Sequence, residues 1–131
     1  MRVIDSSVIA AFILQEPGWE RLAPYLVGWT LDIAFLETLN AIIKALRRGR
    51  MDHRDARIRI KALQSLKAMS VERAFKLLPR IANLALNSKL TVYDAAFIAL
   101  AQEKSLPLVT LDRAQHDEAI RLGTPSTIPR T

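Results

Sequence analysis

Two short apolar runs in the sequence each end at an aspartate and lead into a segment with helical spacing. Residues 2–5 read RVID, and residues 107–112 read PLVTLD. Runs this short, rich in β-branched residues, are typical of buried strands, and their alternation with longer helical segments is typical of parallel strands joined by helices. We therefore predict an α/β fold, a three-layer α/β/α sandwich with a central, mostly parallel sheet.

Apolar periodicity and turn residues set the expected elements. Strands are expected over residues 2–4, 29–33, 107–111 and 127–128. Helices are expected over residues 6–14, 19–27, 34–48, 53–69 and 79–87, from about residue 91, and in a last segment that ends at residue 122. Ser6 or Ser7 is the expected N-cap of the first helix, and Asp52 that of the fourth. The segment from Ser70 to Phe75 has no decisive pattern.

The fourth predicted helix has an apolar side and a basic side. The apolar residues that share one stripe are Ile58, Ala62, Leu66 and Met69. The basic residues on the other stripe are Arg54, Arg57 and Lys61. A stripe of this kind predicts that the apolar side packs on the core and the basic side meets solvent.

Length and composition exclude several classes of protein. A chain of 131 residues is long enough for one sizeable core and short for two, so we expect one domain over residues 1–131. The longest strictly apolar run, Val8–Leu14, is far below the roughly 20 residues that cross a bilayer. No signal peptide is apparent, so we expect a cytoplasmic protein. The chain has no cysteine, which excludes disulfides, thiol catalysis and thiolate metal sites.

Positive charge is concentrated in one part of the chain. The net charge is +6, and residues 44–80 hold twelve Lys and Arg against Asp52, Asp55 and Glu72. This asymmetry indicates a polyanionic partner, most simply nucleic acid, although a solvated basic helix face would give the same pattern. We expect the face from Arg47 to Arg59 to contribute to binding.

Four acids stand in apolar surroundings where a purely solvated role is awkward: Asp5, Glu37, Asp94 and Asp112. Each has an ordinary structural explanation when taken alone. The two strand-end aspartates could cap the helices that follow, the third could meet the dipole of its own helix, and the glutamate could lie on a wetted strip with Asn40.

Taken together, the acids predict a metal site. Carboxylates brought close to one another cannot all remain ionised at neutral pH without a compensating cation. Oxygen ligands without cysteine favour Mg²⁺ or Mn²⁺ over Zn²⁺. Such an ion can activate a water for attack on a phosphodiester, and a basic surface nearby would hold the phosphates of the substrate.

Four segments, VIDSSV, FLETLN, VYDAAFIALA and LVTLDR, together resemble the PIN-domain family, most closely the VapC-type toxins of toxin–antitoxin pairs. The resemblance spans nearly the whole chain. It implies an endoribonuclease dependent on Mg²⁺ or Mn²⁺ that cuts RNA with a metal-activated water. It also implies a homodimer silenced by a cognate VapB-type antitoxin whose C-terminal tail crosses the active-site groove.

The same resemblance assigns roles to individual residues. Asp5, Glu37, Asp94 and Asp112 would form the catalytic, metal-binding cluster. The supporting residues would be Ser7, Asn40 and Thr110. The candidates for substrate binding are Arg47, Arg48 and Arg113. Asp117 is a further acid that we leave outside the core set.

Other functions fit the sequence less well. A phosphatase of the haloacid-dehalogenase type needs a second aspartate where Ser7 stands, and a receiver domain needs an acidic pair that Asp5 lacks. A PIN-like module that binds RNA or protein without cutting remains an alternative, but clustered acids bring no benefit to a binder of polyanions. A housekeeping RNA-processing nuclease is a second alternative, which an antitoxin-like reading frame immediately upstream would argue against.

Overall fold

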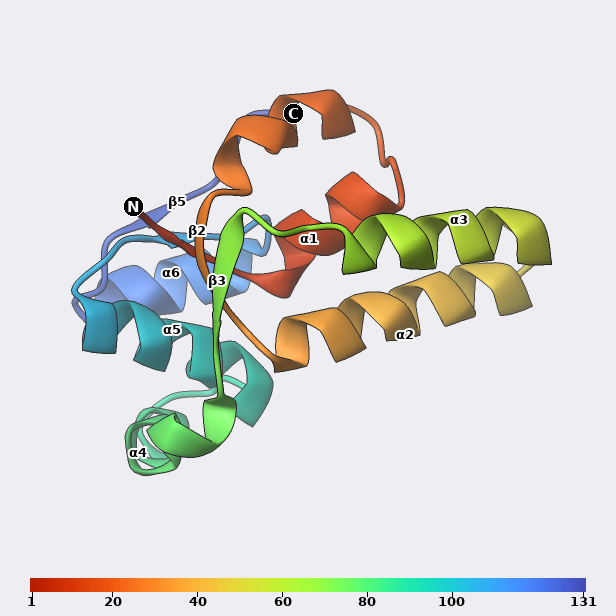
Figure 1. Ribbon diagram of the computed structural model, residues 1–131. Coiled ribbons are helices and arrows are strands. Elements are labelled where there is room, and N and C mark those ends of the chain that lie inside the picture. The colour runs from red at the N-terminus through yellow and green to blue at the C-terminus, as the bar shows by residue number, and fades with distance from the viewer.

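Five parallel strands form a single sheet in the order β3-β2-β1-β4-β5 in the computed structural model, which describes residues 1–131 (Figure 1). The strands are β1 (Val3–Ile4), β2 (Gly28–Leu31), β3 (Met69–Glu72), β4 (Leu108–Val109) and β5 (Ser126–Thr127). The strand β1 lies in the centre, with Val3 paired to Trp29 of β2 and to Leu108 of β4. The parallel sheet predicted from the sequence is confirmed.

Helices cover both faces of the sheet. They are α1 (Ser6–Ile13), α2 (Ile33–Arg47), α3 (His53–Gln64), α4 (Leu78–Leu86), α5 (Val92–Lys104) and α6 (Arg113–Arg121), with 3₁₀ turns η1 (Trp19–Tyr25) and η2 (Ala74–Leu77). Chain order runs from β1 outward to β3 and then from β4 outward to β5. Right-handed crossovers therefore place α1, α2 and α3 on one side and α4, α5 and α6 on the other, as Figure 1 shows. The α/β/α sandwich is confirmed.

The helix α5 is the centre of the core. Its residues from Ala95 to Ala101 are all buried, and Phe97 is 1% exposed. The helix packs against β1, β2 and β4 on its inner side and against α4 on its outer side. A helix that is apolar all round is buried on all sides, so α5 has little freedom to move relative to the sheet.

Gly28 allows the two central strands to approach each other. Its φ of 144° lies in a region that side chains disfavour, and a Cβ atom there would overlap the carbonyl oxygen of Arg2. The adjacent amide of Trp29 donates to that same oxygen at 2.8 Å. The glycine is therefore required for the pairing of β1 with β2.

The helices α2 and α3 form an antiparallel hairpin whose free end points away from the sheet (Figure 1). The apolar stripe predicted for α3 is wrong, because Ile58 is 56% exposed and Met69 belongs to β3. The buried residues of α3 are Ala56 and Leu63. The side chain of Arg59 lies on the packed side, where its guanidinium donates to the carbonyl oxygen of Ile13 at 2.9 Å.

Three further details differ from the prediction. The strand β3 occupies the stretch that had no decisive pattern, because an edge strand with Ser70 and Val71 exposed lacks the apolar run of a central strand. The segment after Gly18 is a 3₁₀ turn that contains Pro24 and not an α-helix. The cap of α1 is Asp5 and not a serine. No helix is both long and apolar enough to span a membrane.

Candidate active site

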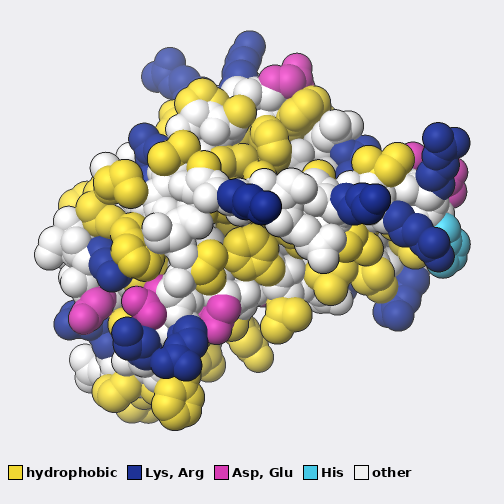
Figure 2. All heavy atoms as spheres, in the orientation of Figure 1, with side chains coloured by type: hydrophobic (Ala, Val, Ile, Leu, Met, Phe, Trp, Pro, Cys, Tyr) yellow, Lys and Arg dark blue, Asp and Glu magenta, His cyan; other side chains and the backbone are white.

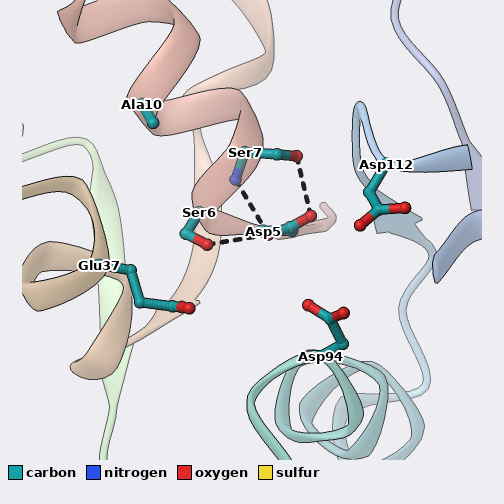
Figure 3. Close-up of a pocket in the computed structure, with 7 residues that line it drawn as sticks. All are labelled: Asp5, Ser6, Ser7, Ala10, Glu37, Asp94 and Asp112. Atoms are coloured by element: carbon teal, nitrogen blue, oxygen red, sulfur yellow. Dashed lines mark hydrogen bonds between the residues drawn. The ribbon is translucent and has the colours of Figure 1, made fainter. Parts of the chain in front are cut away.

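A hollow of about 260 Å³ opens where β1 and β4 end, beside the first turns of α1 and α5 (Figure 3). The residues that line it are Asp5, Ser6, Ser7, Ala10, Glu37, Asp94 and Asp112. All four predicted acids therefore meet at one place, although they come from four separate segments of the chain. No lysine, arginine or histidine is among the lining residues.

Asp5 is the most buried of these acids, with 3% of its surface exposed. It follows β1 with an extended backbone and caps α1, accepting from the amide of Ser7 at Oδ1 (3.0 Å). The hydroxyls of Ser6 and Ser7 donate to Oδ1 and Oδ2 at 3.1 and 2.9 Å. Capping and facing the hollow are thus two roles of the same side chain, because helix N-termini and strand ends meet at this edge of a parallel sheet.

Thr110 and Ser7 connect the first strand to the fourth. The Thr110 hydroxyl contacts Oδ2 of Asp5 and accepts from the amide of Asp112 at 3.0 Å. The Ser7 hydroxyl accepts from the amide of Leu111 at 2.9 Å. The structure therefore places both predicted hydroxyls against the acid cluster. Ser6 is a third hydroxyl in contact with Asp5 that the sequence did not single out.

Asp94 and Asp112 face each other across the hollow (Figure 3). Asp94 lies in the first turn of α5, whose cap Thr91 accepts from its amide at 3.2 Å. Asp112 caps α6 and accepts from the amide of Gln115 at 3.1 Å. Glu37 approaches from α2, and its Oε1 atom is buried without a hydrogen-bond partner.

Burial and mutual repulsion raise the pKa values of three of the acids. Burial is the main cause for Asp5, whose pKa is raised although hydrogen bonds from Thr110 and Ser7 partly offset it. Burial also raises the pKa of Glu37, and the charge of Asp5 adds to the effect.

The pKa of Asp94 rises from 3.8 to about 6, first through burial and then through the charges of Asp5, Asp112 and Glu37. The cluster therefore has more negative charge than its own surroundings stabilise.

The donor set suits a divalent cation with much of its water retained. No three acidic or histidine side chains are close enough together to hold one ion directly. Mg²⁺ is usually bound through one or two carboxylates and keeps several waters, so direct ligation by three is not required. The unpartnered Oε1 of Glu37 and the facing carboxylates of Asp94 and Asp112 are oxygen donors of this kind.

Comparison with known proteins identifies the family. The sequence model of the family described as "PIN domain" matches residues 2–120 of the chain. The chain belongs to the PIN-domain family. "Ribonuclease VapC3" from Pyrobaculum aerophilum is 36% identical over 129 residues, which cover 94% of this chain and 98% of that protein.

Two solved structures share the fold of this PIN domain at low sequence identity. VapC20 of Mycobacterium tuberculosis, described as a toxin that cleaves the sarcin-ricin loop, gives a TM-score of 0.66 at 19% identity and covers 89% of this chain and 94% of that one. A toxin–antitoxin complex from Klebsiella pneumoniae gives 0.61 at 18% identity and covers 88% and 90%. These likenesses show that the fold is shared.

Several predicted residues of the PIN domain lie outside the hollow. Asn40 is exposed on α2 and does not line it. Asp117 is exposed on α6. Arg113 is exposed at the start of α6, beside Asp112 but not lining the hollow. Arg47 and Arg48 lie at the far end of α2, roughly 15 Å along the helix axis from Glu37 at 1.5 Å per residue.

Gln115, like Ser6, is a residue of the site that the sequence did not reveal. Its side chain is 1% exposed and lies behind the acids and not among the residues that line the hollow. Its surroundings in the sequence, RAQHDEAI, are polar and typical of a solvated helix, so nothing there predicts a buried amide. Only the packing of α6 beneath Thr110 accounts for it.

Proposed function

We propose that this PIN domain is a metal-dependent endoribonuclease of the VapC type, with Mg²⁺ or Mn²⁺ as its cofactor. The observation that carries the proposal is the hollow in which Asp5, Glu37, Asp94 and Asp112 meet without any basic side chain. The similarity to "Ribonuclease VapC3" over nearly the full chain supports RNA as the substrate.

Asp94, Asp112 and Glu37 would hold the ion, one or two of them directly and the rest through waters that the ion retains, since their side chains point into the hollow. When bound, a divalent ion supplies the positive charge that the cluster lacks and makes a water more acidic for attack on a phosphodiester. Asp5 adds a further negative charge, and the hydroxyls of Ser6 and Ser7 fix the orientation of its carboxylate.

The outer face of α3 is the proposed RNA-binding surface. Arg54, Arg57 and Lys61 are exposed, and none of them makes an ion pair. Figure 2 shows lysine and arginine side chains gathered at the free end of the α2–α3 hairpin, which also includes Arg47 and Arg48. Unpaired cations on a rigid helix attract phosphates, whereas the acidic hollow by itself would repel them.

The similarity to "Ribonuclease VapC3" also supports a role as the toxin of a toxin–antitoxin pair. Exposed apolar side chains flank two of the acids: Leu36 next to Glu37, and Tyr93 next to Asp94, which are 68% and 60% exposed. Large exposed apolar side chains are typical of protein interfaces. We propose a VapB-type antitoxin and a second copy of the chain as partners in the cytoplasm. Light scattering of the purified protein, alone and after co-expression with any short reading frame found upstream, tests both partners.

Digestion of RNA by the purified protein tests the proposed function. The wild type should cut in Mg²⁺ or Mn²⁺ and not in EDTA. Asp5→Asn, Asp94→Asn and Asp112→Asn should each lower the cutting rate by orders of magnitude while the circular dichroism spectrum is retained, because each removes one charge from the cluster and leaves the shape of the side chain. Wild-type rates in two of these variants would refute the metal-cluster assignment. Binding of RNA without any cutting by the wild type would favour a non-catalytic module.

A further inference from the structure

Gln115 has its polar atoms bonded on both sides of the candidate site. Its Nε2 atom donates to the main-chain oxygen of Asp94 at 3.1 Å. Its Oε1 atom lies 2.9 Å from the Thr110 hydroxyl, whose single proton goes either to this Oε1 or to Oδ2 of Asp5. Because the carbonyl of Asp94 can only accept, the amide nitrogen must be the end that faces it. The orientation of the side chain is therefore fixed by its partners.

The backbone of Gln115 also contacts Asp112. The amide of Gln115 donates to Oδ1 of Asp112 at 3.1 Å. Thr110 in turn contacts Oδ2 of Asp5 and accepts from the amide of Asp112. One side chain on α6 thus connects the first turn of α5 to the junction between β4 and α6, and lies one hydrogen bond away from Asp5.

We infer that Gln115 is a positioning residue that holds Asp94 at a fixed place relative to Asp112 and Asp5. A buried amide is costly unless all its partners are present, and no other residue connects α5 to this junction through side-chain hydrogen bonds. The charges of Asp5, Asp112 and Glu37 act on Asp94, which lies in the first turn of α5, outside the buried stretch Ala95–Ala101. Gln115 holds that turn in place with a bond that needs no metal ion.

The inference rests on the proposed function, because metal binding and RNA cleavage are the properties that the positioning serves. Partners that orient metal ligands typically change metal affinity or activity by about 10- to 100-fold when they are removed. We therefore expect effects of this size from a residue that touches neither metal nor RNA.

The test compares two glutamine variants of the full chain. Gln115→Met keeps the length and volume of the side chain and removes both of its hydrogen bonds. Gln102→Met is the matched control, because Gln102 is a half-buried amide on α5 that bonds to Thr124 and the carbonyl of Leu122, away from the hollow. Mn²⁺ affinity is measured by titration calorimetry, and kcat and KM are measured on an RNA that the wild type cuts.

We expect Gln115→Met to weaken Mn²⁺ binding by about 10-fold or more and to lower kcat with little change in KM. Gln102→Met should leave affinity and kcat within about twofold of the wild type while losing comparable thermal stability. Equal metal affinity and kcat in the two variants would overturn the inference.

A second variant covers the case in which Gln115→Met does not fold. Gln115→Leu removes both polar atoms of the side chain without adding a charge, and we expect the same loss of metal affinity. If neither Gln115 variant folds while Gln102→Met does, the residue is structural and the inference is wrong. If the wild type itself neither binds Mn²⁺ nor cuts RNA, the proposed function fails first.

Discussion

Asp94→Asn should stabilise the metal-free protein above about pH 6 and have little effect near pH 4. The pKa of Asp94 in the folded protein is about 6, against an ordinary value of 3.8. A carboxyl group whose pKa is raised by folding favours the folded state while it is protonated. That contribution is complete below about 3.8 and is lost as the pH rises through about 6. The asparagine variant has no proton to lose, so its stability should not fall over this range on account of residue 94.

The magnitude follows from the two pKa values. Each tenfold difference in proton affinity corresponds to about 1.4 kcal/mol, so a rise from 3.8 to about 6 is worth at most roughly 3 kcal/mol. Asp94 is only half-buried, and solvent screening reduces the effect of such a group, so we expect about 1 kcal/mol. For a chain of this size, that change shifts Tm by about 3–5 °C.

Urea unfolding in EDTA at several values between about pH 4 and pH 8 measures this difference. The control is Asp117→Asn, since Asp117 is exposed on α6 and does not line the hollow. The free energy of unfolding of Asp94→Asn minus that of the wild type should grow with pH and then level off, and the control should show no such trend.

Addition of Mg²⁺ should reverse the order, because a cation in the hollow stabilises four carboxylates better than three. A difference between variant and wild type that is the same at about pH 4 and pH 8 would refute the reasoning, because it would show that burial and the neighbouring charges do not raise the pKa of Asp94.

Three other changes test separate parts of the molecule. Replacing Arg54 and Arg57 with Gln should weaken RNA binding for all sequences and lower the slope of log affinity against log salt by about one per residue; unchanged slopes in filter binding would leave α3 a solubility role. Phe97→Ala should cost about 3–5 kcal/mol in urea unfolding, because Phe97 is 1% exposed in the core. Gly28→Ala should lower Tm by several degrees, since its Cβ would overlap the Arg2 carbonyl, and a wild-type Tm would contradict the close approach of β1 and β2.

The central part of the fold could be predicted because its signals are local. RVID and PLVTLD became β1 and β4 with their aspartates at the strand ends, and the apolar segment around Phe97 became the buried helix α5. Each prediction depended on residues within one element, where periodicity and burial follow directly from sequence.

The failures have a different physical origin. The strand β3 is an edge strand whose exposed Val71 breaks the expected pattern, and its identity comes from pairing with β2. The helix α3 packs on its neighbour α2 and also contacts α1, where Arg59 donates to the carbonyl of Ile13. The strand β2 and the helix α1 are distant in sequence from the elements that they contact, so these contacts could not be predicted from local patterns.

The positions of the four acids and of the supporting hydroxyls of Ser7 and Thr110 were predicted, whereas Ser6 and Gln115 were missed. Asp5 and Asp112 cap helices and also line the hollow, so the capping role does not exclude a role in the candidate site. Gln115 and Ser6 act through bonds to other residues of the site. Their roles depend on three-dimensional contacts, which cannot be predicted from residue type alone. Asn40 shows the converse. Its spacing from Glu37 predicted a place beside the acids, but in the structure it is exposed and does not line the hollow.

The contact between Thr110 and Asp5 joins residues that are 105 positions apart. On a ribosome, the first aspartate is made early and the second half of the hollow is made near the end of synthesis. A growing chain that stops before β4 therefore has Asp5, Glu37 and Asp94 without the strand that orders them. The order of synthesis thus delays assembly of the site until most of the core that supports it can fold, because contacts between distant residues form only after the loop between them has closed.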